Sequence, residues 1–380
     1  MTGKEEQRVD EKRNALLTVG LVCAVLFVLG VADLCNSDRV YSESENRVLA
    51  SRPVFSWESL LSGKYGDAYE EYMSDQFTGR DKWVGIKTRA DILFRKKEVN
   101  GVYLGSDHYL IGVNDPEEYT QQMEDSRIVS LKKLVNRWDA KVMLVPTADN
   151  ILTDKLPAFA PCYDETRLLA KVKESVGEEN YIDVYSALQE HAEEPIYYRT
   201  DHHWTSLGAY YGFLAWADSM GKFPYPYNTA GMKTVSEDFQ GTLQSRINVA
   251  WTKDKIQYFP ETEKKPVTVT YDFADTADSL YAPEYLETKN QYGFFLNDNH
   301  AFIEIYTGYN AGKTLFVIKD SYANSMIPLL TAHYETIYVV DLRYFNGKLF
   351  QLMEQYEPEQ GMDVLVLYDC IHFLEDFKFY

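Results

Sequence analysis

Short apolar runs separated by helical patterns constrain the fold of this chain more than any other feature of its sequence. Residues 140–147 read AKVMLVPT and residues 180–188 read NYIDVYSAL, and three later runs read KTLFVIKD, TIYVVDL and DVLVLYD. Each run is short and rich in β-branched residues, as expected of strands that are buried on both faces. Strands that alternate with helices predict a parallel sheet flanked by helices. The sequence therefore predicts an α/β domain over residues 118–380.

Two regions flank or interrupt this alternation. Residues 35–117 predict a polar connector, an amphipathic helix in SWESLLSGKYGDAYEEYMSDQF, and a hairpin in GVYLGSDHYLIG with Gly105-Ser106-Asp107 at its turn. Residues 221–312 are dense in Tyr, Thr, Pro and Asn and contain alternating pieces such as KPVTVTYDF. Because α/β strands resume after residue 312, we expect a partly β insertion within the domain.

A long apolar segment lies near the N-terminus. Residues 15–32 carry no charge over 18 positions, close to the length that crosses a bilayer core. Basic residues are denser before this segment than in the stretch that follows it up to residue 50: Lys4, Arg8, Lys12 and Arg13 against Arg39 and Arg47. This asymmetry predicts a cytoplasmic tail at 1–14, a transmembrane anchor at 15–34 and an extracytoplasmic remainder. A cleaved signal peptide is the alternative, because Gly30-Val31-Ala32 offers the small residues that a signal peptidase reads.

The net charge and the cysteines limit the binding partners and metal sites that this chain can have. A net charge of −20 argues against binding to nucleic acid or to an anionic membrane surface, since the long-range field repels phosphate. Cys162 and Cys370 lie in the body of the chain, where they could pair in an oxidising compartment. The spacing of the cysteines is not that of a zinc site.

A serine follows one of the predicted strands. In KTLFVIKDSYANSMIPLL, strand 313–318 leads through Lys319-Asp320-Ser321 into a helix. In parallel sheets, functional groups collect beyond the carboxyl ends of strands, and the first N–H groups of a helix are free to stabilise an oxyanion. A plain helix cap by Asp320 or Ser321 is the alternative.

An acid and two histidines precede another predicted helix, in YYRTDHHWTSLGAYYGF. A nucleophilic serine needs a base, and the base needs a carboxylate that fixes its tautomer. Asp201 and His203 can supply both, and Thr205 or Ser206 can cap the helix that holds their loop. We expect no metal, because neighbouring side chains of an extended segment point apart, which leaves His202 facing the sheet or the substrate cleft.

Two other motifs resemble known functional motifs but do not match them. GYNAGKT has three residues between its glycines where a phosphate loop has four, and it precedes a strand instead of following one. KDSYA is not the GxSxG elbow of the α/β-hydrolases. The sequence thus predicts no cofactor and no α/β-hydrolase fold.

At YRTDHHWTSLGAYYG and VIKDSYANS the chain resembles the DHHW family, named for its Asp-His-His-Trp motif and related to the alginate O-acetylation proteins of the J and X types. ENRVLASRP and DQFTGRDKW are similar to segments that accompany this domain, so the resemblance covers residues 45–380. It implies an SGNH-hydrolase-like fold. It also implies a covalent acyl-enzyme mechanism with Ser321 as nucleophile, His203 as base and Asp201 as the residue that orients the base.

The resemblance further implies an O-acetyltransferase that acts on an exported polysaccharide and receives its acyl group from a membrane-embedded partner. Lys-Asp stands before Ser321 where ordinary SGNH hydrolases have Gly-Asp, so the oxyanion donors are open; the Tyr322 N–H is our first candidate. Asn324 and Arg343 are candidates for the rim of the site. A carbohydrate acetyl esterase with the same triad and a non-catalytic glycan-binding protein are the alternatives.

Overall fold

The computed structural model describes residues 3–42, 47–308 and 312–379, and it divides the chain into two compact units, residues 1–90 and 91–380. The first two residues of ENRVLASRP and the centre of GYNAGKT lie outside the described residues. The predicted hairpin at 101–112 lies in the second unit, where Val99, Val102 and Leu110 pack against Leu243 and Ile247.

The first unit consists of helices and one short strand pair. Its elements are α1 (Gly3–Leu34), β1 (Tyr41–Ser42), β2 (Arg47–Val48), α2 (Trp57–Leu61), α3 (Lys64–Gln76) and most of α4 (Arg80–Leu93). The single helix predicted around residues 56–77 is two helices, because Gly63 takes a left-handed φ of 83° and separates α2 from α3.

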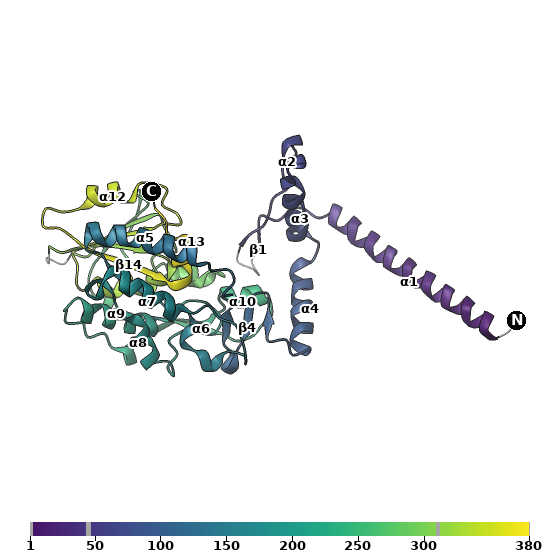
Figure 1. Ribbon diagram of the computed structural model, residues 1–380, viewed down its shortest axis with the longest axis horizontal. Coiled ribbons are helices and arrows are strands. Elements are labelled where there is room, and N and C mark those ends of the chain that lie inside the picture. Colours follow the sequence, from purple (N-terminus) through teal and green to yellow (C-terminus); the bar gives the residue numbers. More distant parts are fainter. Residues whose placement is uncertain (1–2, 43–46, 309–311, 380) are drawn as a thin grey trace. The chain divides into compact units, whose positions relative to one another are not determined.

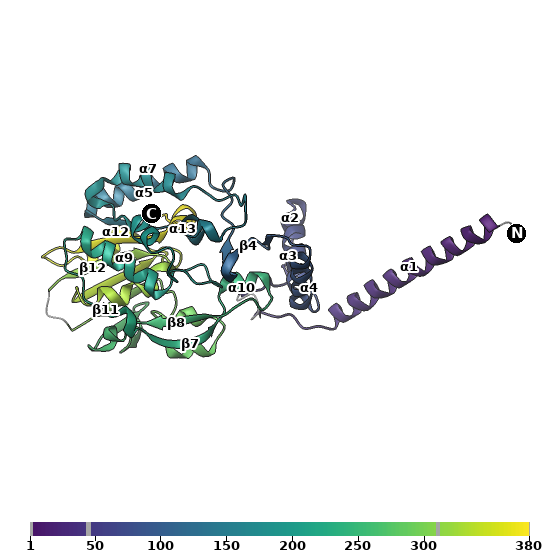
Figure 2. The same cartoon turned by 90° about the horizontal axis from the view of Figure 1, so that it is seen from below.

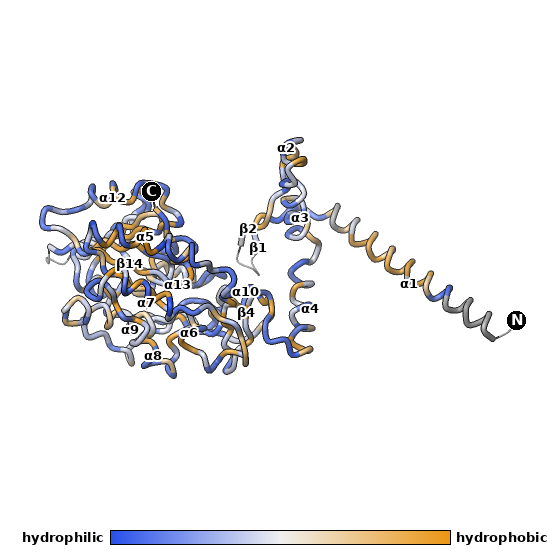
Figure 3. Tube along the Cα trace, in the orientation of Figure 1, coloured by the Kyte–Doolittle hydropathy of each residue, from blue (hydrophilic) through white to orange (hydrophobic). Residues whose placement is uncertain are grey.

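Helix α1 carries the predicted membrane segment. Residues Lys12–Ala32 form a helical window with a mean hydropathy of 2.7, and none of this window is buried. Figure 3 shows the apolar stretch running along the helix. By length and composition α1 is able to cross a bilayer, as an anchor or as a signal peptide.

The second unit is built on a seven-stranded sheet with the order β10-β9-β11-β13-β12-β14-β6. Its strands are β6 (Lys141–Val145), β9 (Thr268–Tyr271), β10 (Asp275–Ala277), β11 (Phe302–Tyr306), β12 (Thr314–Lys319), β13 (Thr336–Asp341) and β14 (Asp363–Asp369). Strands β13, β12, β14 and β6 are parallel, as predicted. Strands β9, β10 and β11 come from the predicted insertion, and they continue the sheet in antiparallel pairing, so the sheet is mixed.

Helices cover both faces of this sheet (Figures 1 and 2). They are α5 (Gln121–Trp138), α6 (Ala148–Ile151), α7 (Glu165–Val176), α8 (Val184–Glu190), α9 (Ser206–Ser219), α11 (Ile327–Leu330), α12 (Leu349–Tyr356) and α13 (Cys370–Asp376). Helix α10 (Thr242–Ile247) packs instead against Val99, Val102 and Leu110. Two small sheets complete the unit: β3 (Glu98–Val99), β4 (Val102–Leu104) and β5 (Leu110–Gly112), and the pair β7 (Lys233–Phe239) and β8 (Asp254–Tyr258).

The strand period of two residues separates two apolar cores. Leu315 and Val317 of β12 face the core that contains α8 and α9. Phe316 and Ile318 face the opposite core, which contains α5, α7, α12 and α13. A strand buried on both faces needs this unbroken apolar sequence, and the α/β prediction is confirmed.

The run NYIDVYSAL is not the strand that its β-branched residues suggested. Tyr181 makes one isolated parallel bridge to Val142, and the chain then enters α8. The side chain of Asp183 accepts a hydrogen bond from the Ser186 N–H at 3.1 Å, which is a helix N-cap. The capping aspartate therefore overrides strand propensity.

All four cysteines are free thiols in the structure, so Cys162 and Cys370 do not pair there. Cys370 is fully buried at the start of α13, and burial raises the pKa of its thiol.

If α1 is retained as an anchor, the full chain will sediment with membranes and will need detergent for extraction, because its apolar window finds no protein cover. A chain that begins at Asn36 should be soluble. Intact mass of the exported protein distinguishes the alternatives: a product that begins just after Ala32 would show a cleaved signal peptide.

Candidate active site

Polar residues follow the ends of three parallel strands, at one edge of the sheet. Strand β12 ends at Lys319 just before Ser321, and β14 ends at Asp369 just before His372. Strand β13 ends at Asp341, two residues before Arg343. Because parallel strands share their carboxyl edge, residues far apart in sequence meet there.

Ser321 begins the tight turn that follows β12. The residues Ser321–Ser325 form a 3₁₀ turn, and α11 follows it. Asp320 caps this turn, because its Oδ1 accepts the Tyr322 N–H at 2.8 Å. The predicted junction is confirmed, although its first turn is 3₁₀ and not α-helical.

The Asp-His-His-Trp segment is a bend that leads into α9. Thr205 caps α9 by accepting the Gly208 N–H at 3.3 Å. The fully buried Trp204 donates from Nε1 to the Tyr322 carbonyl at 2.8 Å, which ties this segment to the turn that carries Ser321. The tryptophan of the motif thus fixes two distant pieces of chain against each other.

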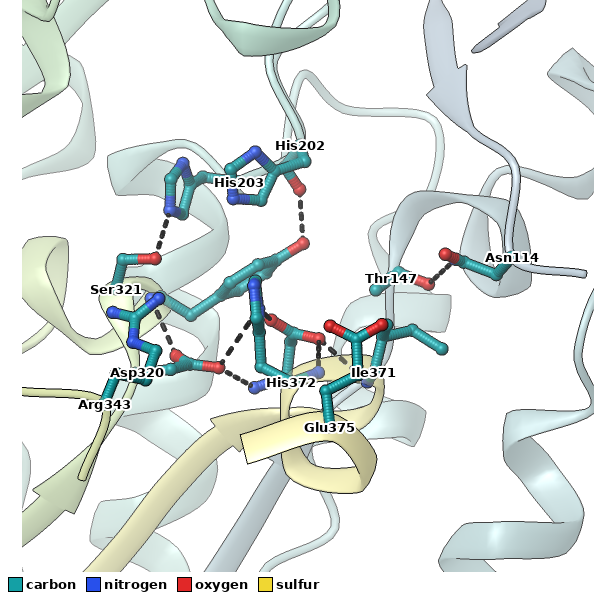
Figure 4. Close-up of polar contacts among 12 residues, drawn as sticks. Asn114, Thr147, His202, His203, Asp320, Ser321, Arg343, Ile371, His372 and Glu375 are labelled. Carbon is teal, nitrogen blue, oxygen red and sulfur yellow. Dashed lines mark hydrogen bonds and ion pairs between the residues drawn. The ribbon is translucent and has the colours of Figure 1, made fainter. Parts of the chain in front are cut away.

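These two pieces bring Ser321, His203 and Asp201 into one hydrogen-bonded row. The Ser321 Oγ lies 2.9 Å from His203 Nε2, as Figure 4 shows. On the other side of the ring, His203 Nδ1 lies 2.5 Å from Asp201 Oδ1. The sequence predicted this convergence across about 120 positions, and both distances suit proton transfer from the hydroxyl to a ring that the carboxylate orients.

Asp201 is held as a charged carboxylate. Its Oδ2 accepts hydrogen bonds from the Thr242 N–H at 2.8 Å and from the Thr242 hydroxyl at 3.1 Å. Burial alone would raise the pKa of Asp201, but His203, His202 and the Thr242 N–H together hold it well below its usual value. An ionised carboxylate at this position stabilises a positive charge on the His203 ring.

A second residue from the insertion fixes the imidazole. The Tyr292 ring stacks on the His203 ring with a centroid separation of 3.9 Å and an angle of 9°. Its hydroxyl donates to the Ser321 carbonyl at 3.1 Å. Sequence reasoning missed both Thr242 and Tyr292, because no local pattern connects either residue to the histidine motif.

His202 corrects one expectation. Its ring lies against that of His203, with centroids 3.9 Å apart, because residues 201–203 form a bend and not an extended strand. Ligand atoms of Asp201, His202 and His203 therefore come within 4.8 Å of one another. Both His203 nitrogens are already engaged by Ser321 and Asp201, so an ion bound here would have to displace one of those partners.

The three rim and oxyanion candidates are also engaged. The Tyr322 N–H, our candidate oxyanion donor, already donates to Asp320, so that prediction is wrong for this geometry. Asn324 is fully buried and accepts a hydrogen bond from Lys319 Nζ at 2.8 Å. Arg343 pairs with Asp341 at 2.7 Å. Asn324 and Arg343 thus belong to a buried polar network around Lys319.

Asp320, Asp369 and His372 form a second acid–histidine cluster, which contacts the turn that begins at Ser321. Asp320 Oδ2 accepts the Asp369 N–H at 2.7 Å, and Asp369 pairs with His372. Burial alone would lower the pKa of His372, but Asp369 and Asp320 raise it to about 10. Burial and the nearby Asp369 raise the pKa of Asp320 to about 8. A charged His372 therefore sits between two carboxyl groups at the start of α13.

A cavity of about 250 Å³ opens beside this row of residues. His202, Tyr322 and His372 belong to its lining, whereas Ser321 and His203 do not. Ser321 and His203 are each 5% exposed, so little of either side chain is accessible to solvent.

The comparisons with known proteins agree with this architecture. The family model of the DHHW proteins matches residues 140–340. A solved DHHW family protein from Eubacterium siraeum aligns with 73% of this chain and 93% of its own, at 25% identity and a TM-score of 0.60. PatB1 of Bacillus cereus with a sulfonyl adduct aligns with 74% of this chain and 99% of its own, at 19% identity and a TM-score of 0.59.

The O-acetyltransferase domain of Pseudomonas putida AlgJ aligns with 72% of this chain and 92% of its own, at 14% identity and a TM-score of 0.43. No curated protein matches the chain in sequence.

Gly241→Ala should disturb the anchor of the row. A Cβ at position 241 would lie 2.2 Å from Asp201 Cβ, so the carboxylate must move. We expect the free energy of unfolding to fall by about 2 kcal/mol or more, a typical cost of overpacking. Gly66→Ala is the matched control, because its Cβ meets nothing within 4 Å. Urea titration measures both; equal stabilities would contradict the close approach.

The stability of the second unit should fall as the pH rises from about 6.5 to about 10. The folded pKa of His372, about 10, exceeds the unfolded value of about 6.5, so its contribution is complete below pH 6.5 and is lost through pH 10. Asp320 adds to this decline up to pH 8. One group contributes at most about 1.4 kcal/mol per pH unit.

His372→Gln should flatten the pH dependence of the urea midpoint, whereas His108→Gln, at an exposed position, should not. An unchanged slope in His372→Gln would contradict the assignment of a charged His372.

Proposed function

Because the chain belongs to the DHHW family, we propose that it is an extracytoplasmic O-acyltransferase, acting on a cell-surface or exported polysaccharide through Ser321, His203 and Asp201. The observation that carries this proposal is the unbroken row of hydrogen bonds from Ser321 Oγ through the His203 ring to Asp201. A serine that contacts a carboxylate-oriented imidazole is the arrangement that acyl transfer through a covalent intermediate requires.

In the first half-reaction, His203 Nε2 takes the hydroxyl proton as Ser321 Oγ attacks the carbonyl carbon of the acyl donor. His203 then returns this proton to the leaving group, and an acyl-serine ester remains. Asp201 keeps the proton of the ring on Nδ1 and stabilises the imidazolium that forms at each transfer.

In the second half-reaction, a sugar hydroxyl enters in place of the leaving group. His203 takes its proton, the sugar oxygen attacks the acyl carbon, and the proton passes to Ser321 as the acylated sugar leaves. Water in place of the sugar would give the acetyl esterase reaction.

The negative charge on the carbonyl oxygen needs a donor other than the Tyr322 N–H. The main-chain N–H of Ser321 itself begins the turn, and it has no acceptor among the contacts of the described residues. We assign the Ser321 N–H as the group that donates a hydrogen bond to this negatively charged oxygen. It lies at the start of a turn, where N–H groups lack partners within the helix.

The acyl donor reaches the site from the membrane. An exported domain has no access to a cytoplasmic acyl donor, so the transfer requires a membrane-embedded partner that hands over the acyl group. Helix α1 supports this arrangement, because it would keep the domain next to such a partner.

Ser321→Ala and His203→Ala should each lower the rate at which a chromophore is released from an acetylated chromogenic ester. The expected decrease is about 10³-fold or more, because triad members act as a unit. The full chain in detergent is the enzyme for this measurement. An acetylated glycan product that forms only in the presence of a polysaccharide acceptor separates transferase from esterase. Equal rates for both variants and the parent would leave only a binding role.

A sulfonyl fluoride supplies a second readout that requires no substrate. An activated serine forms a stable sulfonyl ester, so the parent should gain one adduct by intact mass and Ser321→Ala should gain none. Ser325→Ala is the matched control: it removes a buried serine of the same turn whose Oγ contacts Tyr292 and not His203. Labelling that is lost in Ser325→Ala and kept in Ser321→Ala would contradict the assignment.

A further inference from the structure

The cavity beside the proposed triad has the dimensions of a small binding site. Its volume of about 250 Å³ lies just below the range of pockets that hold drug-sized ligands. It therefore has room for a single sugar ring and not for a length of polysaccharide. Its lining comes from β5 and the segment that follows it, from the start of α6, from α10 and from the start of α13, and the residues His202 and Tyr322 also line it.

His202 stands between this cavity and His203. Its Nδ1 bonds to the Thr242 hydroxyl at 2.8 Å, while its Nε2 has no partner among the contacts of the described residues. The side chain is 31% exposed, and the residue lines the cavity. Desolvation and the neighbouring His203 lower the pKa of His202 to about 3, so the ring is neutral at ordinary pH. A neutral ring nitrogen that is open to a cavity can exchange a hydrogen bond with a hydroxyl group.

The polar groups of the cavity select against anions. Four carboxyl groups line it, those of Glu118, Asp149, Asp369 and Glu375, against two basic side chains, those of Arg246 and His372. His372 and Asp369 pair with each other and cancel, which leaves Glu118, Asp149 and Glu375 against Arg246. Asp149 and Asp369 are buried and already accept hydrogen bonds, whereas Glu118 and Glu375 are exposed. Carboxylates such as these two accept hydrogen bonds from sugar hydroxyls, and their charge repels a uronate or a phosphate. The net charge of −20 on the whole chain acts in the same direction.

We propose that this cavity is a glycan subsite, which binds the neutral sugar next to the one that is acylated. The inference rests on the proposed function, because it takes Ser321 and His203 as the reacting groups. Those two residues do not line the cavity, so a ring bound in it is separated from the acyl-serine by His202 and Tyr322. The adjoining ring of the same glycan then reaches the acyl-serine, while the cavity residues set the register.

The subsite makes the enzyme selective for chain length and for charge. A monosaccharide can fill either the cavity or the reacting position, but only an oligosaccharide fills both at once. An oligomer of uronic acids fits poorly in the carboxyl-lined cavity. The preferred acceptor is therefore an oligomer of uncharged hexoses.

Binding to Ser321→Ala full-length protein in detergent tests the subsite without turnover. The probes are a neutral hexose trisaccharide, its monosaccharide and a uronic acid trisaccharide, followed by saturation-transfer NMR and titration calorimetry. We expect the neutral trisaccharide to bind about tenfold more tightly than the other two probes, the value of one good hydrogen-bonded contact. Equal binding of all three, or preference for the uronate, would overturn the inference.

Two variants in the Ser321→Ala background locate the site. Gly112→Val places a side chain in the lining, at a position where the added Cβ meets only Leu243 Cδ2, at 3.9 Å. His202→Leu removes the open ring nitrogen. Each should lower the affinity for the neutral trisaccharide about tenfold. Glu117→Gln, next to the lining residue Glu118 but outside the cavity, should leave it unchanged.

Catalysis separates this inference from the function on which it rests. If the parent forms an acyl-serine, the partition of that ester between neutral trisaccharide and water should favour the sugar in the parent and shift toward water in Gly112→Val. If the parent is acylated but its acyl-serine partitions between trisaccharide and water as in Gly112→Val, the subsite is contradicted and the proposed function is not. A parent that binds the trisaccharide but never forms a Ser321 ester would sink the proposed function and leave the cavity as a glycan-binding site.

Discussion

The parallel pairing of β12 with β13 and β14 is the constraint on which the rest of the structure depends. This register puts Ser321, Arg343 and His372 beyond the same edge of the sheet, although the chain travels through two helices between them. Strands that are apolar on both faces hold this register firmly, since a slip of one residue would exchange the two cores. The nucleophile candidate is thus placed by the most rigid part of the fold, and the histidine segment is brought to it from outside the sheet.

Charges buried around Ser321 make its turn rigid at some cost in stability. Lys319, fully buried, pairs with Asp341 at 3.2 Å. Buried ions of this kind contribute little net stability, but the loss of one partner is expensive because the other is left unpaired in a low-dielectric interior. Lys319 is the centre of this network, because its Nζ contacts Asn324 and Asp341, and Asp341 in turn binds Arg343.

The insertion contributes residues that contact the candidate site. Thr242 fixes Asp201, Tyr292 stacks on His203, and Gly241 leaves room for the carboxylate. None of these contacts could be predicted, because Thr, Tyr and Gly in a loop-rich stretch are each common and their partners lie about 40 to 90 positions away. The same reason explains the failed expectation for the Tyr322 N–H: its availability depends on whether Asp320 caps the turn, which is a matter of one side-chain rotamer.

The sequence by itself determined the α/β class, the strand that precedes Ser321, a cap of α9 by Thr205 or Ser206, and the apolar segment of α1. These features are local: strand burial, helix capping and bilayer length are written in the spacing of neighbouring residues. It also identified Asp201, His203 and Ser321 as residues of suitable chemistry, from their positions at predicted strand and helix junctions and from the resemblance to a known motif. Only the tertiary structure decided that His202 stacks beside His203, that β9–β11 extend the sheet, and that a carboxyl-lined cavity adjoins the row. Those features depend on which surfaces meet after folding, and contacts between distant segments leave no periodic signal in the chain.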